Sequence, residues 1–168
     1  MLYLKEASLE DWEKEYEAIK DMPYYETGFE NRFYGYSAEE YRDQAVRWML
    51  ESAAGSNLKY DSVPETYFFL WDDDTIVGLF KIRHYLTEEL RQGAGHIGYG
   101  IVEKYRHHGY GTAGLKLAIE KCRQIIKEDE IYLAAYSFNW PSIKVMLNNG
   151  ARLIREEDGI SYFRIRLR

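Results

Sequence analysis

Two periodicities of hydrophobic residues alternate along the chain, and together they predict its strands and helices. Short β-rich apolar runs are typical of strands, whereas apolar residues spaced three and four apart indicate an amphipathic helix. Strands are expected at residues 2–4, 66–71, 76–85, 96–102, 131–136, 152–155 and 160–167. Helices are expected at residues 8–22, 37–54, 111–127 and 142–148. No repeat, linker or low-complexity segment divides this series, so we expect one α/β (α+β) domain over residues 1–168.

Two segments between the predicted elements are candidates to border a substrate. Residues 23–36 read PYYETGFENRFYGY, which is long for a loop, aromatic and broken by two glycines. Long ordered loops in compact domains are often functional. Residues 86–95 form a polar, glycine-ended loop that leads into the next strand. We expect a ligand to approach beside these two segments.

The stretch around which the chain is organised reads GHIGYGIVEKYRHHGYGTAGLKLAIEK, at residues 95–121. A short apolar strand is followed by a basic, glycine-bearing turn and then by a helix. The first backbone N–H groups of a helix lack intrahelical partners, and the helix dipole adds roughly half a positive charge there. Glycines let a phosphate approach the backbone. We therefore expect a pyrophosphate to bind this turn, the alternative being a helix start that binds nothing.

The spacing of the glycines bears on which pyrophosphate binds. Gly109-x-Gly111-x-x-Gly114 formally matches the dinucleotide fingerprint. In that fingerprint the first glycine directly follows a strand, and an acidic residue about 20 positions later binds the ribose. Here Tyr105-Arg-His-His108 lies between strand and glycine, and Ala134 and Ala135 lie where the acid should be. The P-loop pattern also fails, because no Gly-Lys-Ser/Thr follows.

Arg106-x-x-Gly109-x-Gly111 instead resembles the R/Q-x-x-G-x-G/A signature of the GNAT-type N-acetyltransferases. The predicted order β-α-α-β-β-β-α-β-α-β-β extends the resemblance over the whole chain. It implies a central mixed twisted sheet of about seven strands, flanked by about four helices and splayed between residues 97–102 and 131–136. It also implies acetyl-CoA as co-substrate, with its pantetheine arm pairing with the first of these strands. Residues 82–86 and 95–99 further resemble a subgroup of predicted bacterial acetyltransferases of unassigned substrate.

The resemblance implies which residues contact the cofactor. Asn139-x-x-Ser142 is similar to the second family motif, whose asparagine contacts the pantetheine arm. Asn139 also reads as a helix cap with Pro141 in the first turn, and the two readings are compatible. The expected cofactor-binding residues are Ile101, Val102, Arg106, His107, His108, Gly109, Tyr110, Gly111, Thr112, Asn139 and Ser142.

The catalytic half of the family pattern is where this sequence departs. Family members often have a tyrosine that acts as general acid seven residues after the asparagine, and here that position is Met146. Some place a glutamate base five residues before it, and here that position is Ala134. The usual Gly-Phe after the helix is Gly150-Ala151. Substitute groups must therefore come from elsewhere.

The predicted catalytic residues are His96 and Tyr99, on the strand expected beside the thioester. Histidine is the natural base near neutral pH. Because side chains alternate along a strand, the two point to opposite faces unless a bulge intervenes, so we expect only one to reach the site. Tyr136 is another candidate acid, and His84 lies on the neighbouring strand. For each residue, packing or a structural hydrogen bond is the alternative role.

Composition narrows the classes of partner. A net charge of −6 argues against nucleic acid as the main partner. No leading basic-plus-apolar segment and no bilayer-length apolar run is present, so we expect a cytoplasmic protein with no membrane partner. Cys122, the one cysteine, is expected to be buried. The four histidines and this cysteine lack metal-ligand spacing, and Asp72–Asp74 reads as a solvated turn, so we expect no metal.

The function that these features predict is acetyl transfer from acetyl-CoA to a primary amine, by direct attack in a ternary complex. The acceptor is a small molecule or a protein or peptide amine. The missing tyrosine and glutamate leave open a non-catalytic acyl-CoA-binding sensor or regulatory domain. A dinucleotide-binding oxidoreductase domain is a third, weaker alternative. GNAT proteins often form homodimers, but no part of this sequence locates an interface.

Overall fold

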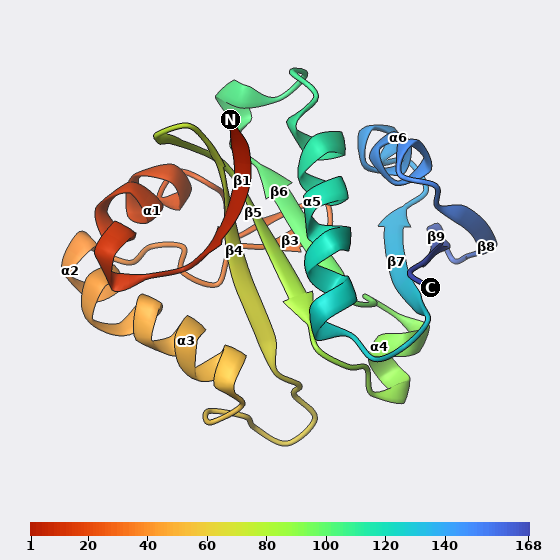
Figure 1. Cartoon of the computed structure of the whole chain (residues 1–168), viewed down its shortest axis with the longest axis horizontal. Helices are drawn as coiled ribbons and strands as arrows, with labels where there is room; N and C mark the ends of the chain where they lie inside the picture. Colours follow the sequence, from red (N-terminus) through yellow and green to blue (C-terminus); the bar gives the residue numbers. More distant parts are fainter.

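The computed structural model describes every residue from Met1 to Arg168. Its strands form two sheets (Figure 1). The first has the order β1-β4-β5-β6 and contains β1 (Leu2–Glu6), β4 (Glu65–Asp72), β5 (Thr75–Arg83) and β6 (Ile97–Ile101). The second has the order β7-β9-β8 and contains β7 (Glu130–Tyr136), β8 (Arg152–Glu157) and β9 (Ile160–Arg166). All seven predicted strands are confirmed, and within each sheet every pair is antiparallel.

The four predicted helices are also present, with small shifts of their ends. They are α1 (Trp12–Ile19), α2 (Ala38–Glu40) continued by a π-helical turn (Tyr41–Ala45) and α3 (Val46–Ala54), α5 (Tyr110–Ile125), and α6 (Trp140–Asn148). A capping box starts α2, because the Ser37 and Glu40 side chains each accept the other residue's backbone N–H. Two single turns of 3₁₀ helix lie at Leu9–Asp11 and Glu103–Tyr105. None of the helices is both long and apolar enough to cross a bilayer.

The two segments expected to border a substrate have more structure than their sequence suggested. Residues 86–95 contain the short helix α4 (Glu88–Gln92), whose first turn is capped by Thr87. The aromatic segment contains a two-stranded hairpin of β2 (Tyr25–Glu26) and β3 (Phe29–Glu30). The turn of this hairpin holds Thr27 and Gly28, both at positive φ. The hairpin is a defined element that can carry contacts to the rest of the fold.

The first sheet separates two hydrophobic cores because the side chains of β4 and β5 alternate between its faces. One core packs against α5 and joins both sheets, and it includes Cys122, which is buried as predicted. The other packs against α1 and α3. A Cβ atom added at Gly114 would lie 2.5 Å from the Phe80 ring, so glycine lets α5 approach the sheet closely. This close packing fixes the start of α5 relative to β6.

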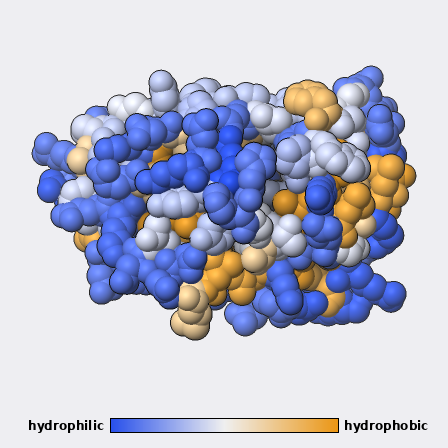
Figure 2. Space-filling model, turned by 90° about the horizontal axis from the view of Figure 1, so that it is seen from above, coloured by the Kyte–Doolittle hydropathy of each residue, from blue (hydrophilic) through white to orange (hydrophobic).

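The outer edge of the second sheet is uncovered in this chain. Figure 2 shows apolar atoms gathered at the right-hand end of the molecule, the end that carries α6 and β8 in Figure 1. Leu147, Leu153 and Ile154 are exposed there. This edge lies away from the junction of the two sheets.

Backbone pairing joins the two sheets at one point only, and His96 adds hydrogen bonds there. β6 and β7 are joined by an isolated bridge between Gly95 and Leu133. Next to it, His96 N–H donates to the Tyr132 carbonyl at 2.8 Å, and Tyr132 N–H donates to His96 Nδ1 at 2.9 Å. The imidazole thus takes the place of a backbone acceptor. Beyond the Gly95–Leu133 bridge and the hydrogen bonds between His96 and Tyr132, no ladder connects β6 with β7. The predicted splay between the two strands is therefore confirmed.

Candidate active site

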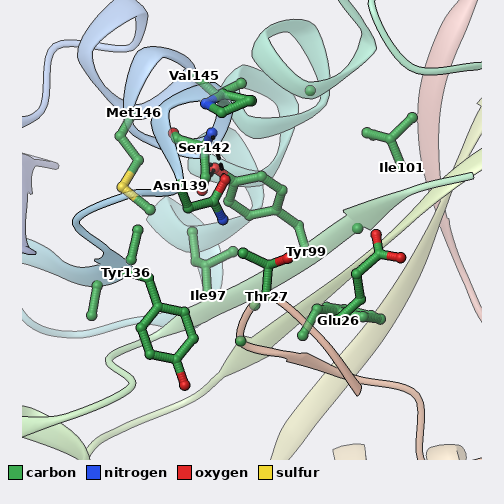
Figure 3. Close-up of a pocket in the computed structure, with 18 of the residues that line it drawn as sticks. Glu26, Thr27, Ile97, Tyr99, Ile101, Tyr136, Asn139, Ser142, Val145 and Met146 are labelled. Carbon is green, nitrogen blue, oxygen red and sulfur yellow. Dashed lines mark hydrogen bonds between the residues drawn. The ribbon is translucent and has the colours of Figure 1, made fainter. Parts of the chain in front are cut away.

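A cavity of about 1110 Å³ occupies the opening between β6 and β7. Its walls come from both strands and from the starts of α5 and α6, and the β2–β3 hairpin covers one side (Figure 3). Most of the predicted cofactor-binding residues line it, and so does Tyr99. Those lining residues are Tyr99, Ile101, Arg106, His107, Gly109, Tyr110, Gly111, Thr112, Asn139 and Ser142. Val102, His108 and His96 do not line the cavity.

Six consecutive backbone N–H groups at one end of the cavity donate to no other protein group. They belong to His107, His108, Gly109, Tyr110, Gly111 and Thr112; the next backbone N–H, that of Ala113, donates to the Gly109 carbonyl at 3.1 Å. Both His107 and Gly109 have positive φ, 65° and 82°, which turns successive amides toward one side. Free amides together with the positive end of the α5 dipole form a site suited to a phosphate or pyrophosphate.

The His108 and Arg106 side chains mainly stabilise the backbone of the turn by hydrogen bonds to its carbonyls and to β6. His108 Nδ1 bonds to the Arg106 carbonyl at 2.7 Å and the Tyr105 carbonyl at 3.1 Å, which braces the turn from outside the cavity. Arg106 Nε donates to the Ile101 carbonyl at 3.1 Å, and its guanidinium also pairs with Glu26 of the hairpin. Arg106 therefore links the turn, β6 and the hairpin.

Gly111 lies where two helices approach each other. A Cβ atom added there would lie 3.0 Å from Val145 of α6 and 3.9 Å from Ile101. The absence of a side chain therefore lets α5 and α6 pack closely, a reason for this glycine that its place in the motif does not reveal. No atom lies within 4 Å of a Cβ added at Gly109, where the positive φ is the constraint.

The edge of β6 that faces the cavity has free backbone groups. Val102 N–H donates to the Val77 carbonyl of β5 at 2.9 Å. Because hydrogen-bonded pairs alternate along an antiparallel ladder, the even-numbered residues of β6 bond with β5. The odd-numbered residues turn their N–H and C=O groups away from β5; these are Ile97, Tyr99 and Ile101. Among them, the Ile101 carbonyl already accepts Arg106 Nε. This edge can accept an extended ligand as an additional strand.

Tyr99 reaches from β6 to the first turn of α6. Its hydroxyl lies 2.8 Å from Ser142 Oγ, and its ring stacks on Phe80 at a centroid distance of 5.3 Å (Figure 3). Burial raises the pKa of Tyr99 to about 12, so this group stays protonated at neutral pH. Asn139 Oδ1 accepts the Ser142 N–H at 3.4 Å, which confirms its predicted capping role.

The position of His96 does not suit the role of base that we predicted for it. Its side chain is fully buried at the closed end of the splay, and Nδ1 is committed to Tyr132. Burial lowers the pKa of His96 to about 4, against the opposing effect of Glu128, whose carboxylate lies 3.5 Å from Nε2. His84 bonds to Thr66 at 2.8 Å and also lies outside the cavity. His107 is the one histidine that lines it.

Two of the positions where the sequence departs from the family pattern lie at the cavity. Met146 and Ala134 line it, so the missing groups leave no proton donor or acceptor at those points. Tyr136 lines the cavity as well, and its hydroxyl lies 2.5 Å from that of Tyr25 in the hairpin. This hydrogen bond raises the pKa of Tyr25. The tyrosine pair and the Arg106–Glu26 pair hold the hairpin over the opening from two sides.

Sequence reasoning missed two cationic residues of the wall, Lys81 and Arg83 of β5. A usable signal was present, because both are charged residues within an otherwise apolar strand, TIVGLFKIR at Thr75–Arg83. Alternation alone could not show that the neighbouring glycines of β6 leave room for them. Their place in the cavity depends on the register between β5 and β6.

A sheet that splays over a cavity, with unpaired amides at a helix start at its mouth, defines an acyl-CoA-dependent N-acyltransferase. The sequence profile of the acetyltransferase (GNAT) domain matches residues 2–152. The chain therefore belongs to the GNAT family of acetyl-CoA-dependent N-acetyltransferases. No curated protein sequence matches the chain.

Solved structures share the fold at low sequence identity. A RimL ribosomal-protein alpha-N-acetyltransferase in complex with coenzyme A has a TM-score of 0.72 at 14% identity, covering 99% of this chain and 94% of that one. The Campylobacter jejuni N-acetyltransferase PseH, in complex with acetyl coenzyme A, has a TM-score of 0.63 at 16% identity and covers 99% of both chains. A spermidine N-acetyltransferase chimera from Vibrio cholerae and hSSAT has a TM-score of 0.64 at 15% identity, covering 99% and 95%.

Proposed function

We propose that this protein transfers the acetyl group of acetyl-CoA to a primary amine, by direct attack within a ternary complex. The observation that carries the proposal is the row of six unpaired amides at residues 107–112. All of these residues except His108 line the cavity that the free edge of β6 also faces. The amides suit the pyrophosphate of acetyl-CoA, and the strand edge suits its amide-bearing pantetheine arm. Two of the similar structures contain coenzyme A or acetyl coenzyme A, which supports this choice.

The two substrates reach the reaction from opposite sides of β6. Acetyl-CoA enters past the start of α5 and alongside Asn139 and Ser142, which line that part of the cavity. The amine enters beneath the β2–β3 hairpin, where the cavity is aromatic. The similar structures act on a ribosomal protein in one case and on spermidine in another, so both protein amines and small amines remain candidate acceptors.

The chemistry requires the amine as a free base, since only a neutral nitrogen has the lone pair that attacks the thioester carbon. A C–N bond forms, the carbonyl oxygen becomes an oxyanion, and the C–S bond then breaks. Free N–H groups of β6 are the donors for the oxyanion. The departing thiolate accepts a hydrogen bond from Tyr99, whose hydroxyl stays protonated at neutral pH. No histidine lines the acceptor side, so water takes the proton of the amine.

Ligand-induced stabilisation tests the binding half of the proposal. Acetyl-CoA and CoA at about 100 times their Kd should each stabilise the protein by roughly 2.7 kcal/mol, whereas NADH and ATP should not. For a domain of this size that corresponds to a rise in Tm of about 5–10 °C. Stabilisation by NADH but not by acetyl-CoA would overturn the proposal in favour of a dinucleotide-binding protein.

Turnover tests the catalytic half. A panel of amines with acetyl-CoA, assayed by release of the CoA thiol, should contain at least one acceptor that is acetylated. Saturable acetyl-CoA binding without turnover on any amine would instead indicate the non-catalytic sensor.

A further inference from the structure

The face of β6 that points toward the hairpin has no side chains of its own, and neighbouring residues fill that space. Gly98 and Gly100 occupy this face. A Cβ atom added at Gly98 would lie 3.4 Å from Lys81 Cε, and one added at Gly100 would lie 3.3 Å from the Phe29 ring. Lys81 therefore extends across β6 inside the cavity, on the side where the acceptor enters. Any side chain at position 98 would contact it.

The Lys81 ammonium has no carboxylate partner within 4.0 Å, the limit within which the ion pairs of this chain fall. Its polar contact is the Glu30 carbonyl at 3.4 Å. The ammonium also lies 5.0 Å from the Phe29 ring centre and 5.9 Å from that of Tyr67. Burial lowers the pKa of Lys81 because it disfavours the charged form, and the Glu65 and Glu30 carboxylates oppose this shift.

Two charged residues near Lys81, Arg83 and Glu65, pair with each other. Arg83 lies 3.6 Å from Glu65 and donates to the Gly95 carbonyl at 2.9 Å. Glu65 also accepts the Tyr67 hydroxyl at 2.9 Å. Burial lowers the pKa of Lys81; Glu65 opposes this shift, whereas Arg83 adds to it.

The two carboxylates of the hairpin do not reach Lys81 either. Glu26 pairs with Arg106 on the cofactor side. Glu30 is exposed, and its carboxylate lies 3.5 Å from the Tyr24 hydroxyl. Lys81 therefore forms no ion pair within the acceptor side of a chain whose net charge is −6.

We propose that the acceptor is an amine that also carries an anionic group, and that this group pairs with Lys81 beneath the β2–β3 hairpin. An ammonium held in a partly buried wall is matched best by a ligand anion, because the pair strengthens as water is excluded. This inference names the acceptor of the proposed acetyl transfer and rests on that function for the transfer step. Binding of the anionic group depends on Lys81 and does not require that the acetyl group is transferred.

The first experiment compares amines that carry an anionic group with related amines that lack one. β-Alanine is paired with β-alaninamide, and 2-aminoethyl phosphate with ethanolamine, and kcat/KM is measured for each. The parent protein should prefer the anionic member of at least one pair by about 10–100-fold, the range expected for a hydrogen bond to a charged group. The pair with the larger ratio identifies carboxylate or phosphate as the preferred anion.

Variants then assign the preference to Lys81. Lys81→Met should abolish it by lowering kcat/KM for the anionic amine alone, and Lys81→Arg should retain most of it. Lys116→Met is the matched control, because it removes one lysine charge from the exposed face of α5 and should leave the preference unchanged. The Kd of acetyl-CoA should stay the same in all three variants.

A second readout needs no turnover, so it separates this inference from the proposed function. In the presence of CoA, calorimetry should show N-acetyl-β-alanine binding the parent at least about 10-fold more tightly than its amide, a difference lost in Lys81→Met. Equal binding of acid and amide, or a preference that persists in folded Lys81→Met, would overturn the inference. Lys81 would then be a packing residue held by the aromatic rings. Lys81→Gln provides the same test if Lys81→Met does not fold.

Discussion

Replacing His96 with alanine is expected to destabilise the protein strongly while leaving the turnover of the folded protein nearly intact. The substitution removes the acceptor of the Tyr132 N–H, and leaving a buried donor unpaired costs about 1–3 kcal/mol. It also opens a cavity at a fully buried position, and large-to-small changes of this kind cost about 2–5 kcal/mol. Together these effects amount to roughly 3–8 kcal/mol, which for a domain of this size lowers Tm by about 6–32 °C.

Two measurements separate the structural role of His96 from a catalytic one. Unfolding by heat and by denaturant gives the loss of stability, and release of the CoA thiol well below the new Tm gives kcat. We expect kcat to stay within about 3-fold of the parent, because His96 does not line the cavity. A general base would contribute about 10²–10⁴-fold.

His96→Asn is the matched control, since its amide oxygen can replace Nδ1 as the acceptor of the Tyr132 N–H. It should recover part of the stability lost in the alanine variant, by about 1–3 kcal/mol. The reasoning is refuted if His96→Ala remains folded and binds acetyl-CoA normally but loses about 100-fold in kcat. It also fails if His96→Asn is no more stable than His96→Ala.

Three further predictions concern the helix junction, the proposed hydrogen-bond donor to the thiolate and a buried carboxyl group. Gly111→Ala places a methyl group 3.0 Å from Val145, so both stability and acetyl-CoA affinity should fall. Adding Val145→Ala should restore both quantities. If calorimetry shows no recovery in the double variant, the packing role of Gly111 is wrong. Tyr99→Phe should lower kcat by about 10–100-fold with an unchanged Kd for acetyl-CoA, and a full kcat would remove Tyr99 from the chemistry. Burial raises the pKa of Glu15 from its usual 4.5 to about 8, so the folded state holds a proton that the unfolded state has released. Stability should fall as pH rises from 4.5 to about 8, by up to about 5 kcal/mol, and Glu15→Gln should flatten that slope in pH-dependent denaturation; an unchanged slope would locate the titrating group elsewhere.

The sequence by itself determined the order of elements and the place of the phosphate turn. Strand and helix periods are local properties, as are the capping box at Ser37 and the glycines at 109 and 111. The unpaired amides of residues 107–112 follow from the start of a helix after a glycine-bearing turn, whatever packs around it. The motif is likewise local, so the sequence alone showed that Met146 replaces the family's tyrosine.

Only the tertiary structure decided which side chains reach the cavity. His96 and Tyr132 lie 36 positions apart, and their pairing, which turns a candidate base into a clamp, depends on where β6 meets β7. The lack of an ion pair at Lys81 likewise depends on the register of β5 with β6 and on the partners that Glu65 has already taken. The partners of a side chain are set by contacts between distant segments, which no local pattern encodes. The sequence therefore predicted the cofactor end of the site, whereas the acceptor end emerged only from the folded chain.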